Sequence, residues 1–427
     1  MPDQSHLSFL NNPNKQKLKG QTMSDPTSLA SRLKQRFNKD ISQLVPETSD
    51  MQRRLEFRKD LEQGASAEFD IQLSNDAGFS VGRGSVTLNG SVDQVSARAS
   101  VNGYSCILQA KVSYDLIKRA SSDEKAFAKF ADGKFLNLVN AMRNREELLA
   151  LVGRRGVGKI ESENGSGVVV ITKATWIPAF WASAVGAKFV AFDSLTGSTQ
   201  HAGNITVTAV DIATRTVTFT SDGTIAELNA NDYIFPKGQH NDGRIGLLDI
   251  AHNTGTLYGI SATTYPLWSA NSYDCGTSAL TVGKILEASA LSANKGASME
   301  KLVCYVPPKT MQALTADESA LIRRDPNAKV MKSGAQGIEI QSSTGTIDII
   351  PHLLMAEGQA VIYPPDYTYF IGSCEATSSV AKDGEILFDL ESSSDKELRM
   401  FSDHTLFCEK PGYITYITRS DNLALHE

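Results

Sequence analysis

Residues 121–153 read SSDEKAFAKFADGKFLNLVNAMRNREELLALVG, and their pattern predicts one long helix. Ser121 is a candidate N-cap, and Glu124, three residues later, completes a capping box. Gly153 stands where a left-handed glycine commonly closes a helix. At the standard rise per residue the helix is roughly 45 Å long. Its apolar residues recur mostly at steps of three and four, as one helix face requires: Phe127, Phe130, Ala131, Leu138, Ala141, Met142, Leu148, Leu149 and Val152.

The next residues, GRRGVGKI at 153–160, have the glycine and lysine spacing of a phosphate-binding loop. That motif ends in a hydroxyl that holds magnesium, but Ile160 occupies the position here. The motif also requires a strand before the loop and a helix after it. Here the predicted helix comes first, and GVVVITK at 167–173 predicts a strand. We therefore interpret GRRGVGKI as a helix-to-strand connection, with a nucleotide-dependent enzyme as the minor alternative.

Residues 66–110 have the alternating pattern of strands. SAEFDIQLS and SVDQVSARASVNGYSCILQAKV alternate small or apolar residues with polar ones, and NDAGFSVGRGSVTLNG between them is rich in turn residues. This pattern predicts a long two-stranded ribbon. Because isolated hairpins are marginal in water, we expect the ribbon to lie on another subunit.

The rest of the chain divides into three further regions. Residues 161–245 predict a β-rich unit, with a hairpin at 205–220 and a strand at 231–238. An α/β region follows, with a helix at 281–296 closed by Gly296. It continues with a strand at 301–308, a helix at 309–324 and a hairpin at 337–352. After about Gly372 we expect short strands at 385–390, 396–401, 404–410 and 412–418.

Charge is unevenly distributed along the 427 residues. The net charge is −6, but residues 1–60 carry +4 (eleven Lys or Arg against seven Asp or Glu), so residues 61–427 carry −10. Residues 26–63 have helical spacing with a thin apolar stripe and cannot form a core alone. This basic N-terminal segment is either a solvated arm or one that docks on an acidic neighbour or on nucleic acid.

No pattern in the sequence predicts a catalytic, cofactor-binding or metal-binding site. The five cysteines are scattered without C-x-x-C spacing, which fits assembly in a reducing cytoplasm. The seven histidines are also scattered, without H-E-x-x-H spacing. The acidic pair Glu146 and Glu147 is expected to be solvated. The apolar TWIPAFWASAVGA at 175–187 is too short to span a bilayer and predicts a buried β-rich segment. We therefore expect a protein that is not an enzyme.

The order of these segments resembles the major capsid proteins of tailed bacteriophages, the Hong Kong 97 type of fold. SCILQAKVSYDLIKRASSDEKAFAKF and NREELLALVGRRGVGKI resemble the strand, spine helix and exit loop of that family. NDYIFPKGQHNDGRIGLLDI and HNTGTLYGISATTYPLWSAN are similar to the stretch that leads into its axial domain, and CYVPPKTMQALTADES to a strand-helix step within that domain. SSDKELRMFSDHTLFCEKPGYI resembles its final strands. The unit at 161–245 departs from the minimal plan of the family.

The resemblance implies an α+β fold and a structural role. The implied function is self-assembly as hexamers and pentamers into an icosahedral phage head, formed in the host cytoplasm around double-stranded DNA that is held by weak, non-specific contacts. Scaffolding, portal and decoration proteins are the implied partners, and an encapsulin-like nanocompartment shell is the alternative. The implied parts are an N-terminal arm (1–65), extended loop (66–110), peripheral domain with spine helix (111–160), β-rich insert (161–245), axial domain (246–372) and returning C-terminal strands (373–427).

The extended loop supplies four candidate inter-subunit contact residues: Phe79, Val81, Arg83 and Arg98. Some members of the family cross-link a lysine of this loop to a neighbouring asparagine. Here no lysine occurs between Lys59 and Lys111. Arginine stays protonated and cannot act as the nucleophile. The expected shell is therefore non-covalent, with the loop held by strand pairing, apolar contacts and arginine pairs with acidic groups of the next subunit.

Overall fold

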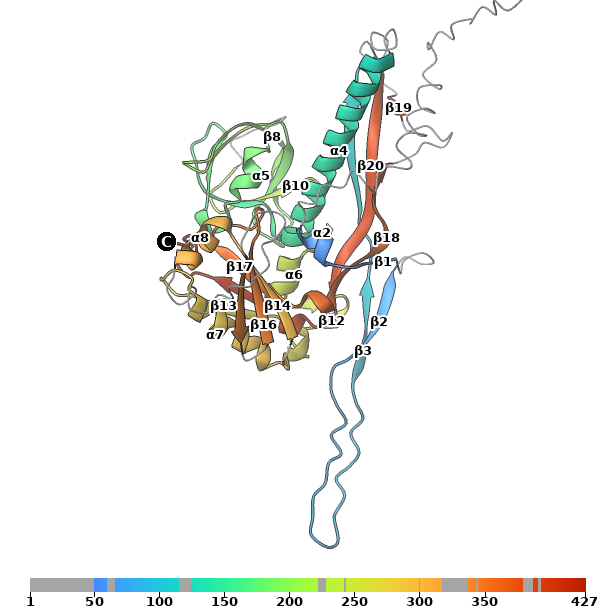
Figure 1. The fold of residues 1–427 in the computed structure, drawn as a ribbon, viewed down its shortest axis with the longest axis vertical. Helices are drawn as coiled ribbons and strands as arrows, with labels where there is room; N and C mark the ends of the chain where they lie inside the picture. The colour runs from blue at the N-terminus through green and yellow to red at the C-terminus, as the bar shows by residue number, and fades with distance from the viewer. Residues whose placement is uncertain are drawn as a thin grey trace, which may run out of the picture. The chain divides into compact units, whose positions relative to one another are not determined.

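The structure is a computed structural model that describes residues 50–59, 66–114, 124–221, 228–241, 243–298, 300–316, 337–342, 345–378, 387–390 and 393–427. Most of the expected arm, the expected N-cap Ser121 and the later part of the helix expected at 309–324 lie outside these residues. Helices and strands are mixed, as predicted (Figure 1). The described residues divide into two units, each described by itself: residues 109–114, 124–136, 378, 387–390 and 393–399 belong to the first, and all other described residues belong to the second.

The predicted long helix is present as α4 (Glu124–Val152). Its apolar stripe is buried at Phe135, Leu138, Met142, Leu148 and Val152. Gly153 follows at φ 59°, and a side chain at this position would collide with the Asp249 carboxylate. The predicted left-handed glycine at the helix end is therefore confirmed. A single 3-10 turn, η1 (Gly153–Arg155), leads into a strand and not into a second helix.

In the first unit, a strand hairpin lies beside a third strand. β19 (Leu387–Leu390) pairs antiparallel with β20 (Ser393–Cys408), and the end of β4 (Ser105–Val112) also belongs to this unit. Lys111 Nζ lies 2.9 Å from the Asp395 carboxylate. The strands expected at 396–401 and 404–410 are in fact one strand, β20. Residues 402–403, which separate the two expected strands, continue β20, and Ser402 is fully buried within it.

The second unit contains a six-stranded sheet that corresponds to the predicted α/β region. Its centre is β14 (Glu300–Val306), which pairs parallel with β16 and antiparallel with β17. Strand Leu302–Val306 is fully buried, as expected for the middle of a sheet. Helices α7 (Val282–Ala293) and α8 (Pro308–Ala316) belong to this region, and Gly296 closes α7 at φ 99° as predicted. The sheet order is β13 (Asn271–Asp274), β21 (Thr415–Thr418), β17 (Gln359–Tyr363), β14, β16 (Gly345–Pro351) and β15 (Ile338–Ser342).

The expected β-rich insert is a closed six-stranded barrel, also in the second unit (Figure 1). The expected hairpin at 205–220 is confirmed by the pairing of β8 with β9. TWIPAFWASAVGA forms the short helix α5 (Pro178–Ala182) instead of the predicted strands. Its predicted burial is only partial, since Val185 is 61% exposed and the buried residues are Trp176, Ile177, Phe180, Trp181 and Ala184. Trp181 of α5 packs against Phe189 and Phe219, with ring centroids 5.5 and 6.3 Å away. Around the barrel the strands are β10 (Tyr233–Pro236), β5 (Gly158–Glu163), β6 (Val168–Ile171), β9 (Thr216–Ser221), β8 (Gln200–Asp211) and β7 (Lys188–Phe192).

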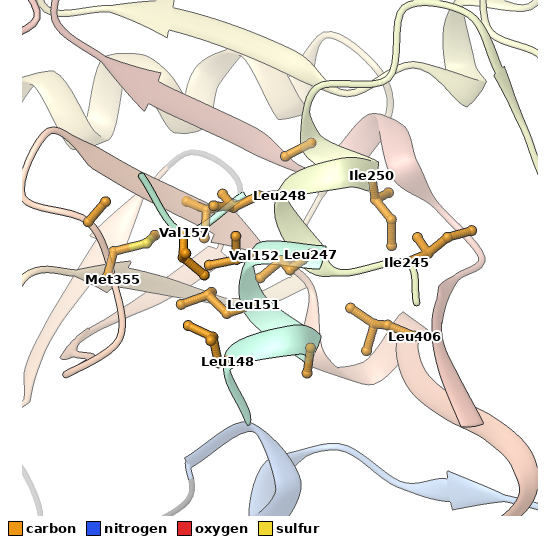
Figure 2. Packing of buried hydrophobic residues seen from close by; sticks show 14 of the residues in the cluster. Leu148, Leu151, Val152, Val157, Ile245, Leu247, Leu248, Ile250, Met355 and Leu406 are labelled. Atoms are coloured by element: carbon orange, nitrogen blue, oxygen red, sulfur yellow. The ribbon is translucent and has the colours of Figure 1, made fainter. Parts of the chain in front are cut away.

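The end of α4 is held in the core of the second unit by helix α6 (Leu247–Ala251). Figure 2 shows Leu151 and Val152 facing Leu247, with Leu148, Val157, Ile245, Leu248, Ile250, Met355 and Leu406 around them. All of these side chains are buried, and burying each contributes about 1.5–3 kcal/mol. The remaining described helix and strands of this unit are α2 (Asp50–Arg54), β1 (Phe57–Arg58), β2 (Ala67–Gln72), β3 (Ser96–Val101), β11 (Thr256–Leu257), β12 (Ile260–Ser261) and β18 (Thr368–Ser378).

Candidate assembly interface

The predicted ribbon is present as a hairpin of residues 67–101, in which β2 pairs antiparallel with β3 from Ala67↔Val101 to Gln72↔Ser96. The sequence placed its second arm at 91–112, but that stretch is two strands. β3 ends at Val101, and β4 begins at Ser105 and pairs with β20 instead. The ribbon is therefore shorter than the sequence pattern indicates.

The base of the ribbon is anchored in the second unit. Ala99 and Val101 are fully buried. Phe69 stacks on Phe407, with ring centroids 4.8 Å apart and planes 22° apart. The Ser100 N–H donates to the Tyr258 carbonyl at 2.9 Å. Core packing and a backbone hydrogen bond therefore fix the direction in which the ribbon leaves its subunit.

Beyond the paired strands, the two arms stay together through scattered hydrogen bonds. The Ala77 N–H donates to the Val92 carbonyl at 2.9 Å. The Gln94 N–H donates to the Asp76 carboxylate at 2.7 Å, and Asn89 Nδ2 donates to the Phe79 carbonyl at 2.9 Å. Side chains thus replace a regular ladder at residues 73–95, which we call the ribbon tip.

The ribbon tip carries an unusual share of exposed apolar surface. Of the twelve large hydrophobic residues that are exposed in the described parts of the chain, six lie at residues 79–95. Phe79 and Val81 are each 80% exposed, and Leu88 is 82% exposed. The others are Val86, Val92 and Val95. An exposed apolar group of this kind, on a segment without its own core, is typical of a surface that another chain covers.

The four residues predicted to contact other subunits differ in their position on the ribbon and in their contacts within the chain. Phe79 and Val81 are exposed apolar groups of the ribbon tip, and Arg83 lies beside them in sequence. Arg98 lies at the paired strands, where it forms ion pairs with Glu68 at 2.9 Å and Asp70 at 3.1 Å of its own ribbon. Its pairing with acidic groups of another subunit stays a prediction.

Leu88 and its neighbours were missed from the sequence. Val86, Leu88 and Val92 each lie two residues from a glycine, in a stretch that the sequence pattern indicates as turn-rich. The alternation of Val86, Thr87 and Leu88 was the available signal.

The GRRGVGKI loop has a geometry unlike that of a phosphate-binding loop. Two of its backbone donors are engaged within the fold: the Arg154 N–H donates to the Asp249 carboxylate at 2.7 Å, and the Val157 N–H donates to the Ile234 carbonyl at 2.8 Å. Gly158 and Lys159 belong to strand β5, and Lys159 Nζ lies 5.6 Å from the centre of the Tyr233 ring. The Arg154 N–H therefore faces a carboxylate, and the lysine lies on a strand instead of at the start of a helix, as a phosphate-binding loop would require.

We expect no binding of ATP at GRRGVGKI. Ile160 offers no hydroxyl to magnesium, and it is fully buried in the barrel. Equilibrium binding of a fluorescent ATP analogue, with and without magnesium, measures this directly. Submicromolar affinity that is lost in Lys159→Ala would contradict the expectation.

The root of the N-terminal segment is docked on α4 through a buried carboxylate. Glu147 accepts the Met51 N–H of α2 at 2.9 Å and lies 2.9 Å from His352 Nε2. Asp50 accepts a hydrogen bond from the Tyr305 hydroxyl at 2.9 Å. The prediction that Glu146 and Glu147 are solvated is wrong, since each is only 4% exposed. α2 covers Glu147, and sequence spacing on α4 alone carries no sign of that cover.

Glu146 belongs to a second buried polar cluster, around Arg244. The Arg244 guanidinium donates to Ser402 Oγ at 3.0 Å, contacts His404 Nε2 at 3.0 Å and lies 3.9 Å from Glu146. Burial raises the pKa of Glu146, and Arg244 partly offsets that rise. Burial, with Arg244 beside the ring, lowers the pKa of His404 well below its usual range. His404 therefore stays neutral and accepts from Arg244.

Comparison with solved structures finds similar folds in capsids and a virus-like particle. One similar structure is the capsid asymmetric unit of cyanophage A-1(L), with 12% sequence identity and a TM-score of 0.46. The match covers 88% of this chain and 91% of the cyanophage chain. The capsid of a native GTA particle is 8% identical over the same shares, with a TM-score of 0.45. A virus-like particle from Pyrococcus furiosus is 9% identical and covers 91% and 98%, with a TM-score of 0.38. No protein-family model and no curated protein matches the chain.

Two further findings concern the described residues alone. None of their helices is long and apolar enough to cross a membrane. Among them, histidine, cysteine and acidic side chains form no group of three that could hold a metal ion.

Proposed function

We propose that this chain is a major capsid protein of the Hong Kong 97 type, which assembles as hexamers and pentamers into an icosahedral head around double-stranded DNA. The observation that carries the proposal is the ribbon of residues 67–101, with a base fixed in its own subunit and a tip that exposes apolar side chains. Such a segment gains stability only when a neighbour covers it.

The mode of assembly follows from the contrast between the buried base of the ribbon and its exposed tip. A ribbon that leaves one subunit and packs on a different surface of the next makes a head-to-tail contact, and such contacts close into rings when the rotation permits. Burial of Phe79, Val81 and Leu88 supplies the apolar part of that contact. The role is structural, in the virion, with scaffolding, portal and decoration proteins as further partners and with weak, non-specific contact to DNA.

Assembly of the purified full-length protein tests the proposal. Light scattering and negative-stain microscopy should reveal hexamers, pentamers or closed shells over a range of salt concentrations, with and without a scaffolding protein. A monomer that persists at high concentration under all of these conditions would refute it. Particles that enclose protein cargo and no DNA would instead favour the nanocompartment alternative.

The mature shell is expected to be free of covalent cross-links. The ribbon contains no lysine, since none occurs between Lys59 and Lys111, and its cations Arg83 and Arg98 remain protonated. A boiled denaturing gel of mature particles should therefore give a single band near the chain mass of 46.2 kDa. A ladder of multimers that survives boiling and reductant is the contrary result.

A further inference from the structure

A cavity of about 570 Å³ in the second unit has a positively charged wall that the assembly role does not use. It lies where the loop after the ribbon, the turn after α4, the start of the α6–β12 segment and a barrel loop meet. Asn102 and Asn253 contribute amides to its lining. Among the described residues that line it, the charged or titratable groups other than tyrosine are Arg154, Arg155, Asp249 and His252.

Arg154 is a fixed part of this wall. Its Nε donates to the Gly243 carbonyl at 2.7 Å, and one terminal nitrogen donates to the Tyr104 hydroxyl at 2.7 Å. Its backbone N–H donates to Asp249. The guanidinium is thus held in one orientation at the cavity.

Arg155 differs from Arg154 because its charge is not directly compensated. Within the described part of the chain, no hydrogen bond or ion pair engages its guanidinium, although the side chain is partly buried. Burial lowers the pKa of Arg155, while Asp249 opposes this from beyond ion-pair distance. None of its nitrogen atoms is among the fully buried atoms that lack a partner, so the guanidinium reaches the solvent that fills the cavity. An anion there can accept charge-assisted hydrogen bonds from it.

The charge balance of the cavity favours an anion at neutral pH. The two arginines carry +2 and an ionised Asp249 carries −1. His252 is neutral, because burial lowers its pKa to about 3. The surrounding amides and hydroxyls can donate hydrogen bonds to oxygen atoms of a ligand.

We propose that this cavity binds a tetrahedral oxyanion, a phosphate or sulfate group, with Arg155 as its principal ligand and Arg154 as a preoriented second donor. The group could be a free anion or a phosphate of a nucleic acid, which share this chemistry. The proposal does not depend on capsid assembly, because the cavity belongs to a single chain.

The affinity of the cavity for an anion should rise in mild acid. Burial raises the pKa of Asp249 to about 6. The hydrogen bonds from the Arg154 and Gly246 N–H groups and the charges of both arginines lower this pKa, but they offset the effect of burial only in part. Arg154, Arg155, His252 and Tyr258 are the titratable groups near this carboxyl. Protonation of Asp249 below pH 6 removes the one negative charge, whereas sulfate remains a dianion.

Calorimetric titration of the full chain with sodium sulfate, against sodium chloride of equal ionic strength, tests the site. Wild type and the charge-matched control Lys188→Gln, at an exposed position outside the cavity and the ribbon, should bind sulfate equally. Arg155→Gln should bind sulfate at least about tenfold more weakly. Sulfate should bind about tenfold more tightly at pH 5.5 than at pH 7.5, a difference that Asp249→Asn removes. Inorganic phosphate and a duplex oligonucleotide, titrated in parallel, separate a free anion from a nucleic-acid phosphate.

Three results would overturn the proposal. The first is an absence of sulfate binding by wild type, and the second is equal affinity in wild type and Arg155→Gln. If Arg155→Gln does not fold, the nearly isosteric variant Asn253→Asp tests the site in its place. It adds a negative charge to the lining, so it should weaken sulfate binding by roughly tenfold. The third overturning result is therefore an affinity of Asn253→Asp for sulfate that equals the affinity of wild type. Failure of assembly with intact sulfate binding would refute the capsid role alone.

Discussion

Replacing Phe79 and Leu88 together with serine is expected to abolish particle assembly and leave the folded subunit intact. Both side chains are at least 80% exposed in the single chain, so the replacement removes nothing from its core. In a shell, each buried side chain would contribute about 1.5–3 kcal/mol to its contact. Since every subunit repeats that contact, the loss multiplies across the particle.

Light scattering and negative-stain microscopy measure the assembly, and thermal unfolding followed by circular dichroism measures the fold. The matched control is the double replacement of Val185 and Leu353 with serine, since these side chains are 61% and 67% exposed and lie outside the ribbon. The control should assemble as wild type does. Wild-type particle yield from the Phe79 and Leu88 variant would show that the ribbon tip does not carry the contact.

Arg244→Ala is expected to lower the free energy of unfolding by about 3–5 kcal/mol, because it leaves a buried carboxyl without its partner. Arg244 is 1% exposed, and Glu146 Oε1 already lacks a hydrogen bond within the described residues. The change also removes the donor to Ser402 and the contact with His404. Urea unfolding of the full chain gives the measurement.

Two further variants test whether the loss of stability in Arg244→Ala comes from the unpaired buried charge. Arg98→Ala removes an arginine whose ion pairs are solvent-exposed, and it should have little effect on unfolding. Combining Arg244→Met with Glu146→Leu removes both buried charges and should recover most of the stability. If Arg244→Ala unfolds at the same urea concentration as wild type, the cluster contributes nothing measurable.

The elements that sequence predicted well are those fixed by local signals. α4, α7 and the β8–β9 hairpin each combine a clear apolar period with a glycine or a turn at the end. Gly153 and Gly296 both adopt the left-handed conformation that their positions predicted. In these cases the local preference and the tertiary fold agree.

The features that sequence missed depend on contacts between distant residues. Closure of the barrel requires β10 to pair with both β5 and β7, and no local pattern encodes that pairing. The burial of Glu147 depends on α2, 96 residues earlier in the chain. Likewise, Asp403 falls between two strands that the sequence predicted as separate, but within β20 it accepts a hydrogen bond from Ser373 at 2.7 Å.

The candidate interface was only partly predictable for a related reason. Sequence indicated a ribbon without a core, and Phe79 and Val81 are exposed on it. It could not indicate that Arg98 pairs with Glu68 and Asp70 of its own ribbon, because that depends on the register of β2 and β3. The cavity at Arg155 is beyond sequence reasoning altogether, since four separate segments form it.

The closed barrel has a consequence for how this chain can change in evolution. Its first and last strands, β5 and β10, are direct neighbours, and the Val157 N–H just before β5 donates to the Ile234 carbonyl of β10 at 2.8 Å. The chain therefore departs for the barrel and returns from it at almost one point. A module with adjacent ends can be gained, lost or exchanged without rerouting the polypeptide on either side. The same property makes this junction a natural place to splice in a foreign domain for display.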